Sequence, residues 1–383
     1  MNAPDILGPS GSTRPRVMLV LKEYPQISQT YIKTEIEALE KEFELKIVTR
    51  KGPDIAYDDS RPHEFAETDE EFLRIALAFR PDILHTHYLT ELGFIGRLAE
   101  RIGVPFTVRA HSFDTIALRR KSLKGRIKQM IKRTPPLERT PSFIENMRWM
   151  DSENCLGVLI FPCSRPWLLR AGVRSDKLVD CFPSVAVRDF LDRSENGLDI
   201  MNTGVATPKK AMPQYLRLAR KTPDVHFRLY AMGYDLDWLK SLDADMGAGV
   251  EFMEPVSPAA MPSEYKRHRW LVYTGDFDIP TVGWPMAIAE AQASGVGVCM
   301  PRLRPDLVDY VGEGAGILYT SIDELPAIIS GPVPQEMRER GFEQAKKSDI
   351  ENHKHLLTDL WREALKSAPY RPRPGTTPPL ALV

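Results

Sequence analysis

Cysteine is scarce in this chain of 383 residues, and long apolar runs are missing. The 4 cysteines are Cys155, Cys163, Cys181 and Cys299. They are scattered, which argues against a disulfide-stapled scaffold, and no pair has the spacing of a metal site. No stretch approaches the ~18 apolar residues of a membrane span, and no basic start with an apolar core marks a signal peptide. We therefore expect a cytoplasmic protein.

An excess of either charge is also missing. The chain has 51 Lys and Arg residues against 52 Asp and Glu residues, for a net charge of −1. A surface built for nucleic acid would be far more basic, so we expect no nucleic-acid partner. Hydrophobic residues make up 43% of the chain, enough for separate cores. At ~100–200 residues per domain, the length predicts two domains.

Short apolar strands alternate with helices along both halves of the chain. This alternation predicts an α/β protein with two doubly wound parallel sheets. The strands expected in the first half are Arg16–Leu21, Leu45–Thr49, Asp82–His85, Val104–Ala110 and Leu156–Pro162. Those expected in the second half are Leu198–Thr203, Val225–Ala231, Val250–Met253, Trp270–Thr274, Val296–Met300 and Gly316–Tyr319.

The stretch between Pro183 and Glu195 has no clear periodicity, and we place the domain boundary there. We expect Rossmann-like domains at 16–188 and 189–345, followed by a helix at 346–368. Residues 1–15 and the proline-rich residues 369–383 are expected to be loose tails, because they lack periodicity or cannot form a regular helix.

Histidines follow two of the expected strands, where open parallel sheets bind their ligands. His87 lies just past the strand Asp82–His85, and His111 follows the strand Val104–Ala110. A ligand contact and a turn or helix cap are equally compatible with His87. For His111 we favour a functional role, because Asp114 lies three residues further on.

Two segments of the second half could bind an anion and a hydroxyl. The loop from Gly204 to Lys210 precedes a helix, and free helix amides beside Lys209 and Lys210 suit a phosphate, although lysines in loops are often only solvated. The segment Trp284–Gly295 forms a small apolar helix that contains Glu290. This carboxylate either faces solvent or accepts hydrogen bonds from a ligand hydroxyl.

These segments together resemble GT-B glycosyltransferases of the large retaining group known as family 4. The similar stretches occur in the family's order. They are Tyr24–Ile36, Asp82–His87, Pro105–Asp114, Gly204–Lys210 and Trp284–Gly295. The resemblance implies a GT-B fold: two Rossmann-like domains facing a cleft, with the C-terminal helix crossing back to the first domain.

The resemblance also implies roles for single residues. His111, with Asp114, would lie at the reaction centre, and Lys210, with Gly204 and Lys209, would face the donor diphosphate. Glu290 would bind the nucleotide ribose beside Trp284. The family's arginine and second glutamate are replaced by Val205 and Val282, and Ser112 stands where the family has glycine. Other sugar contacts are therefore sought at His87, Asp276 and Asp278.

The implied activity is transfer of a sugar, with retention, from a nucleotide-sugar to a saccharide or lipid-linked acceptor. Synthesis of envelope polysaccharide or exopolysaccharide is the implied pathway, and neither a cofactor nor a metal is expected. The alternative is a non-catalytic GT-B protein that binds a saccharide or a partner enzyme, which the two valines favour. A sugar-nucleotide epimerase fits the motifs less well.

A basic stretch stands apart from these motifs. Residues 119–133 carry many Lys and Arg residues, and Leu123, Ile127, Met130 and Ile131 fall on one helical face. Such a helix either packs on its own domain or binds an anionic membrane surface peripherally, at the inner face of the membrane.

Overall fold

The computed structural model describes residues 14–111, 114–115, 147–279 and 282–366. The basic stretch 119–133, the C-terminal tail 369–383 and the N-terminal tail as far as residue 13 lie outside the described residues. Among the helices of the described ranges, none is both long enough and apolar enough to cross a membrane.

The first domain is built on a parallel sheet of seven strands in the order β3-β2-β1-β4-β5-β6-β7. The strands are β1 (Arg16–Glu23), β2 (Glu44–Lys51), β3 (His63–Phe65), β4 (Ile83–His87), β5 (Phe106–Arg109), β6 (Cys155–Ile160) and β7 (Leu178–Asp180). The sequence did not predict β3 and β7. With three residues each, they are too short to show a periodicity.

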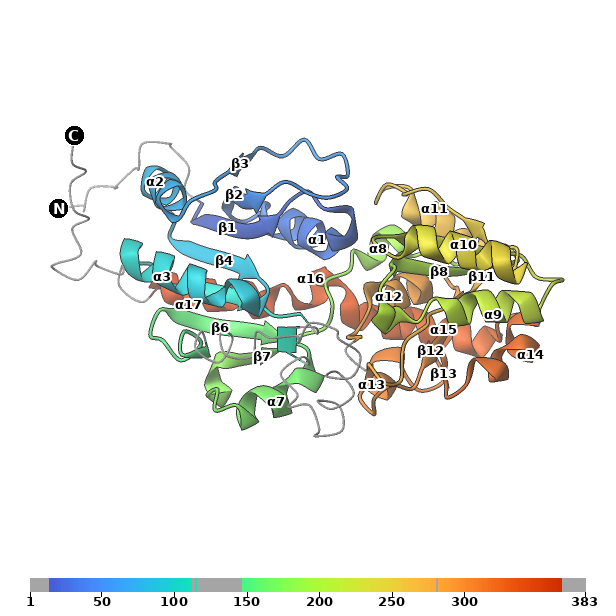
Figure 1. Ribbon diagram of the computed structural model, residues 1–383. Coiled ribbons are helices and arrows are strands. Elements are labelled where there is room, and N and C mark those ends of the chain that lie inside the picture. Colours follow the sequence, from blue (N-terminus) through green and yellow to red (C-terminus); the bar gives the residue numbers. More distant parts are fainter. Residues whose placement is uncertain (1–13, 112–113, 116–146, 280–281, 367–383) are drawn as a thin grey trace, which may run out of the picture.

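Helices cover both faces of this sheet (Figure 1). On one face α1 (Thr30–Leu39) and α17 (His355–Lys366) bury their apolar sides against the strands. On the other face α2 (Asp69–Phe79), α3 (Leu92–Ile102) and α7 (Arg165–Arg170) pack in the same way. Gly103 ends α3 in the left-handed conformation, with φ 73°, as the sequence predicts for a C-terminal glycine.

The second domain has a parallel sheet of six strands in the order β10-β9-β8-β11-β12-β13. Its strands are β8 (Asp199–Val205), β9 (Phe227–Met232), β10 (Glu251–Phe252), β11 (His268–Val272), β12 (Gly297–Pro301) and β13 (Ile317–Tyr319). One face is covered by α9 (Pro213–Lys221), α10 (Leu236–Met246) and α14 (Leu325–Ser330). The other is covered by α11 (Met261–Lys266), α12 (Met286–Ala293) and α13 (Leu307–Val311).

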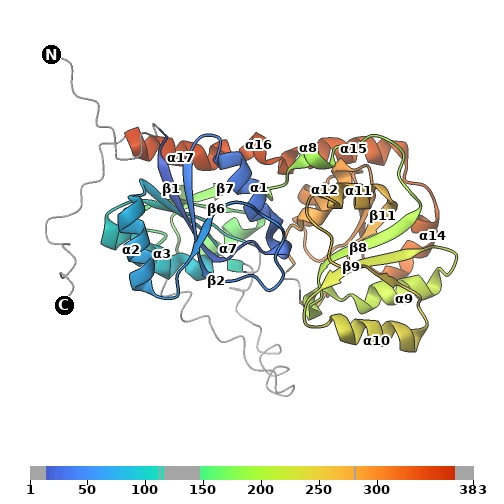
Figure 2. The same ribbon diagram turned by 90° about the horizontal axis from the view of Figure 1, so that it is seen from above.

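The chain crosses between the two domains twice, and the two crossings lie side by side. The N–H of Val185 donates to the carbonyl of Ser348 at 2.9 Å, and the N–H of Ile350 donates to the carbonyl of Val185 at 3.0 Å. From α15 (Gln335–Ala345) the chain returns through α16 (Ile350–His353) to α17, along one side of both domains (Figure 2). The helix expected at 346–368 is interrupted at Lys354.

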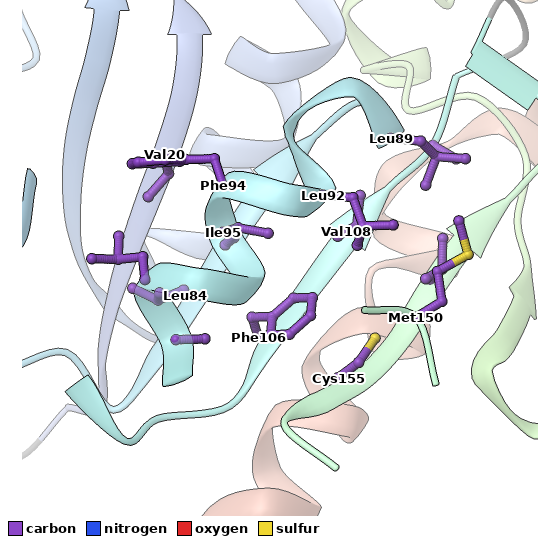
Figure 3. Packing of buried hydrophobic residues seen from close by; sticks show 14 of the residues in the cluster. Val20, Leu84, Leu89, Leu92, Phe94, Ile95, Phe106, Val108, Met150 and Cys155 are labelled. Carbon is purple, nitrogen blue, oxygen red and sulfur yellow. The ribbon is translucent and has the colours of Figure 1, made fainter. Parts of the chain in front are cut away.

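The core between β5 and α3 gives a direct test of this packing. Phe106 is fully buried and lies among Leu84, Ile95 and Cys155 (Figure 3). We predict that Phe106→Ala lowers the free energy of unfolding by about 3–5 kcal/mol, since it leaves a cavity that the sheet cannot collapse to fill. Denaturant unfolding measures this change. Phe65→Ala is the matched control, because Phe65 is 53% exposed, and a comparable loss in both variants would contradict the packing.

Candidate functional site

A cavity of about 530 Å³ lies between the two domains. Its first-domain wall includes Tyr31, Tyr88 and His111, and its second-domain wall runs from the end of β8 to α12. Strand ends of both parallel sheets contribute to it, as the rule for ligand sites in open sheets requires. The residues predicted for the site that line this cavity are His111, Gly204, Lys209, Lys210, Trp284 and Glu290.

His111 follows β5 and is held by contacts on several sides. The centre of its ring lies 4.5 Å from that of Tyr31 and 4.4 Å from that of Tyr88. Its Nε2 lies 3.1 Å from Nδ1 of His87. Burial, more than the neighbouring charged groups, holds the pKa of His111 well below its usual range. The ring is therefore neutral at pH 7.

Asp114 supports His111 and does not line the cavity. Its carboxylate accepts the N–H of His111 at 2.8 Å and the N–H of Leu89 at 2.6 Å. Burial raises the pKa of Asp114 to about 7, although these N–H groups favour the ionised form. The structure thus gives Asp114 a place behind the loop that carries His111.

His87 also lies behind His111, where it is only 2% exposed. Its Nε2 lies 3.1 Å from Oε1 of Glu35, a buried residue of α1 that also contacts Nε2 of His85 at 2.8 Å. Arg109 donates through Nε to the other carboxylate oxygen of Glu35. Burial alone would raise the pKa of Glu35, but Arg109 and the two imidazoles hold it well below its usual range.

Sequence reasoning missed Glu35, although it lies inside the quoted stretch Tyr24–Ile36. The sequence signal for a buried Glu35 was its position next to Ile36 and three residues after Ile32, on the apolar side of a helix. Within the described part of the chain, Glu35, His85 and His87 also form the group whose ligand atoms are close enough for a metal, within 4.8 Å of one another. Because the guanidinium of Arg109 already neutralises this carboxylate, the residues do not fit a resident cation.

Lys210 lies on the second-domain wall of the cavity. Gly204, at φ 127°, makes room for it, because a Cβ there would meet Nζ of Lys210 at 1.9 Å. The ammonium donates to the carbonyl of Thr203 at 3.3 Å and lies 4.9 Å from the ring centre of Tyr273. Desolvation, and then the charge of Lys209, lowers the pKa of Lys210 to about 7. Among the ion pairs of the described residues, none involves Lys210.

Glu290 comes from α12 and faces the same cavity. The Tyr265 hydroxyl donates to its Oε2 at 2.7 Å, and burial raises the pKa of Glu290 to about 7. The neighbouring Trp284 stacks on Tyr310 with ring centres 4.9 Å apart and donates through Nε1 to Asp306 at 2.8 Å. The cavity therefore has a rigid aromatic wall beside a carboxylate.

Asp276 and Asp278, proposed as sugar contacts, are not part of the cavity lining. The N–H of Asp276 donates to the carbonyl of Lys209 at 2.9 Å, and Asp276 in turn accepts the N–H of Asp278 at 2.8 Å. They form a turn beside the cavity. Val205 and Val282 do line it, and they bring apolar surface where the resembling family has charge.

One family model matches part of the chain. Residues 47–134 match the family model described as a glycosyl transferase 4-like domain. Among curated proteins, no sequence matches the chain.

Solved structures are similar over nearly the whole chain. HepE of Anabaena, in complex with UDP-glucose, has a TM-score of 0.69 at 13% identity, covering 92% of this chain and 99% of its own. A sucrose-phosphate synthase from Thermosynechococcus elongatus has a TM-score of 0.66 at 14% identity, covering 93% and 100%. The lipopolysaccharide outer core galactosyltransferase WaaB has a TM-score of 0.58 at 12% identity, covering 92% and 99%. The expected GT-B fold is confirmed.

Proposed function

We propose that this GT-B protein is a glycosyltransferase that moves a sugar from a nucleotide-sugar donor to an acceptor hydroxyl in the interdomain cavity. The observation that carries the proposal is Lys210. A largely enclosed ammonium with a lowered pKa and no carboxylate partner among the described residues is costly unless an anion binds to it. The diphosphate of a nucleotide sugar supplies that charge.

The remaining donor contacts follow from the same wall. The Glu290 carboxylate has Oε2 bound to Tyr265, which leaves Oε1 to accept hydrogen bonds from the ribose hydroxyls. Lys210, Lys209 and the amides of the loop after β8 would stabilise the negative charge of the leaving diphosphate. That stabilisation grows as the bond to the sugar breaks, so it accelerates the reaction.

The acceptor would enter against the first-domain wall, near His111. In the retaining reaction that the family resemblance implies, its hydroxyl attacks from the face that the diphosphate leaves. We further propose a saccharide or lipid-linked acceptor of envelope or exopolysaccharide synthesis, which the similarity in fold to a lipopolysaccharide galactosyltransferase supports. The basic composition of residues 119–133 supports peripheral contact with an anionic membrane.

A second candidate function uses the same cavity for binding but involves no sugar transfer. The side chains of Val205 and Val282 offer no hydrogen bond to a nucleotide sugar, which favours a non-catalytic protein that binds a saccharide or a partner enzyme. Absence of nucleotide binding would decide for this candidate.

We predict that Lys210→Ala and Glu290→Gln each weaken binding of UDP-glucose about ten- to a hundredfold. A hydrogen bond to a charged group contributes ~1.5–3 kcal/mol. Calorimetry with UDP-glucose as the probe measures the effect. Lys221→Ala and Glu343→Gln are the matched controls, because both side chains are more than half exposed and neither residue lines the cavity. If the unmutated protein bound neither UDP-glucose nor other nucleotide sugars, the proposed donor site would be wrong.

Lys210 also predicts how binding depends on pH. Its pKa is about 7 in the free protein, and an adjacent diphosphate favours the charged form and raises that pKa. Above pH 7 the complex must therefore take up a proton, so the affinity for UDP-glucose falls by up to about tenfold per pH unit. Below pH 7 the Lys210 ammonium is already charged and adds no further change, so a decrease in affinity there reports protonation of Glu290, whose pKa is also about 7.

Calorimetry between about pH 6 and 8.5 measures this profile, in a range where the diphosphate of a nucleotide sugar does not titrate. Lys210→Arg should abolish the fall in affinity above pH 7, because arginine stays charged throughout, whereas Lys221→Arg should leave the profile unchanged. A flat profile for the unmutated protein would show that Lys210 does not meet the diphosphate.

A further inference from the structure

A chain of hydrogen bonds runs from the C-terminal helix α17 to the cavity. Nε1 of Trp361 donates to Oγ1 of Thr107 at 2.9 Å, and Oγ1 of Thr107 lies 2.8 Å from Nδ1 of His85. Nε2 of His85 and Nε2 of His87 lie 2.8 and 3.1 Å from the same oxygen of Glu35. Nδ1 of His87 then lies 3.1 Å from Nε2 of His111.

The bond from Trp361 to Thr107 has a fixed direction, because an indole N–H only donates. The Thr107 hydroxyl has two lone pairs, so this bond leaves it able either to donate to Nδ1 of His85 or to accept from it. The proton on Nε2 of His85 is set from the other side of the ring, by Glu35.

The links beyond Glu35 are directed by its charge. Arg109 donates to the second carboxylate oxygen, which keeps Glu35 ionised and able only to accept. His87 must then donate to it through Nε2. Because burial lowers the pKa of His87 to about 4, the ring carries a single proton at neutral pH and its Nδ1 is bare. The bond between the two rings is therefore donated by Nε2 of His111.

The other ring nitrogen of His111 is then an acceptor. Within the described residues, Nδ1 of His111 has no hydrogen-bond partner, and it is not among the unpaired side-chain atoms that are sealed from solvent. The ring lines the interdomain cavity. Nδ1 thus keeps a lone pair available to a ligand and has no proton to give.

We propose that Glu35 is a positioning residue that acts through His87 to hold His111 in the tautomer protonated on Nε2, so that His111 accepts a hydrogen bond from a hydroxyl of the bound sugar. The assignment of the hydroxyl rests on the proposed sugar transfer. The assignment of the tautomer does not, because it follows from the hydrogen bonds of the free protein.

In this tautomer, His111 favours ligands that carry a hydroxyl group able to donate a hydrogen bond to Nδ1. A sugar with a hydroxyl at this point can donate to Nδ1, whereas a deoxy or O-methyl analogue leaves the nitrogen unpaired after the cavity has been desolvated. A His111 ring that exchanged freely between tautomers could accept a hydrogen bond from a hydroxyl or donate one to an ether oxygen. It would therefore discriminate less between a sugar and its O-methyl analogue.

The tautomer is measured by ¹⁵N NMR of the full chain with labelled histidine, of which it has 8 residues. The His111 signals are identified by their loss in His111→Asn. We expect an unprotonated Nδ1 and a protonated Nε2 at pH 7. Detection of the opposite tautomer in the unmutated protein would overturn the proposal without any variant.

Two variants test the role of Glu35 itself. Glu35→Gln can donate as well as accept, so His87 and then His111 should become mixtures of tautomers. His87→Leu removes the acceptor while Arg109 and Glu35 stay paired, and it should free His111 in the same way if Glu35→Gln does not fold. Glu70→Gln, an exposed change on α2, should leave the His111 signals unchanged.

UDP-glucose provides the functional arm. Its addition should shift Nδ1 of His111 toward the value of a hydrogen-bonded acceptor, and UDP without the sugar should not. A fixed tautomer with no response to UDP-glucose would contradict the hydroxyl contact alone. A His111 that stays a single tautomer in both Glu35→Gln and His87→Leu would refute the role of Glu35, whatever the protein binds.

Discussion

The ionic bond between Glu35 and Arg109 is the interaction on which the first-domain half of the cavity depends. It joins α1 to β5 in the interior, where both side chains are almost fully buried. Either charge alone would be strongly destabilising there, because burial in a medium of low polarity favours the neutral form. Once paired, they order their neighbours: His85 and His87 from β4 contact the Glu35 carboxylate, and the sulfur of Cys181 accepts a hydrogen bond from Arg109 at 3.1 Å. The position of His111 at the cavity wall follows from this buried network.

The two sides of the cavity differ in whether their charged groups have partners. On the first-domain side, Glu35 is satisfied by its neighbours and needs no ligand. On the second-domain side, Lys210 has only a carbonyl and an aromatic face as partners among the described residues, and Glu290 has one hydroxyl. Lys210 and Glu290, which have no ionic partner among the described residues, thus both lie on the wall that would receive the donor. A protein that keeps such groups enclosed loses stability in the free state, and ligand binding restores it.

Much of this arrangement could be predicted from the sequence, for local reasons. The strands Arg16–Leu21 and Val296–Met300, among others, were found because apolar runs bounded by turns mark buried parallel strands. His111, Lys210 and Glu290 were found because they follow strand ends or interrupt an apolar helix. The sequence could not predict that His87 faces Glu35, because these residues are 52 positions apart and meet only through the packing of α1 on β4. It also could not show that Asp276 and Asp278 form a turn outside the cavity lining.

The proposed function requires one cavity to hold a nucleotide sugar with its diphosphate at Lys210 and its sugar beside His111. A crystal structure of the protein with UDP-glucose tests this arrangement. We expect a diphosphate oxygen within hydrogen-bond distance of Nζ of Lys210, ribose hydroxyls at Glu290, and a sugar hydroxyl at Nδ1 of His111. A nucleotide bound elsewhere, or one in this cavity with its phosphates turned away from Lys210, would contradict it.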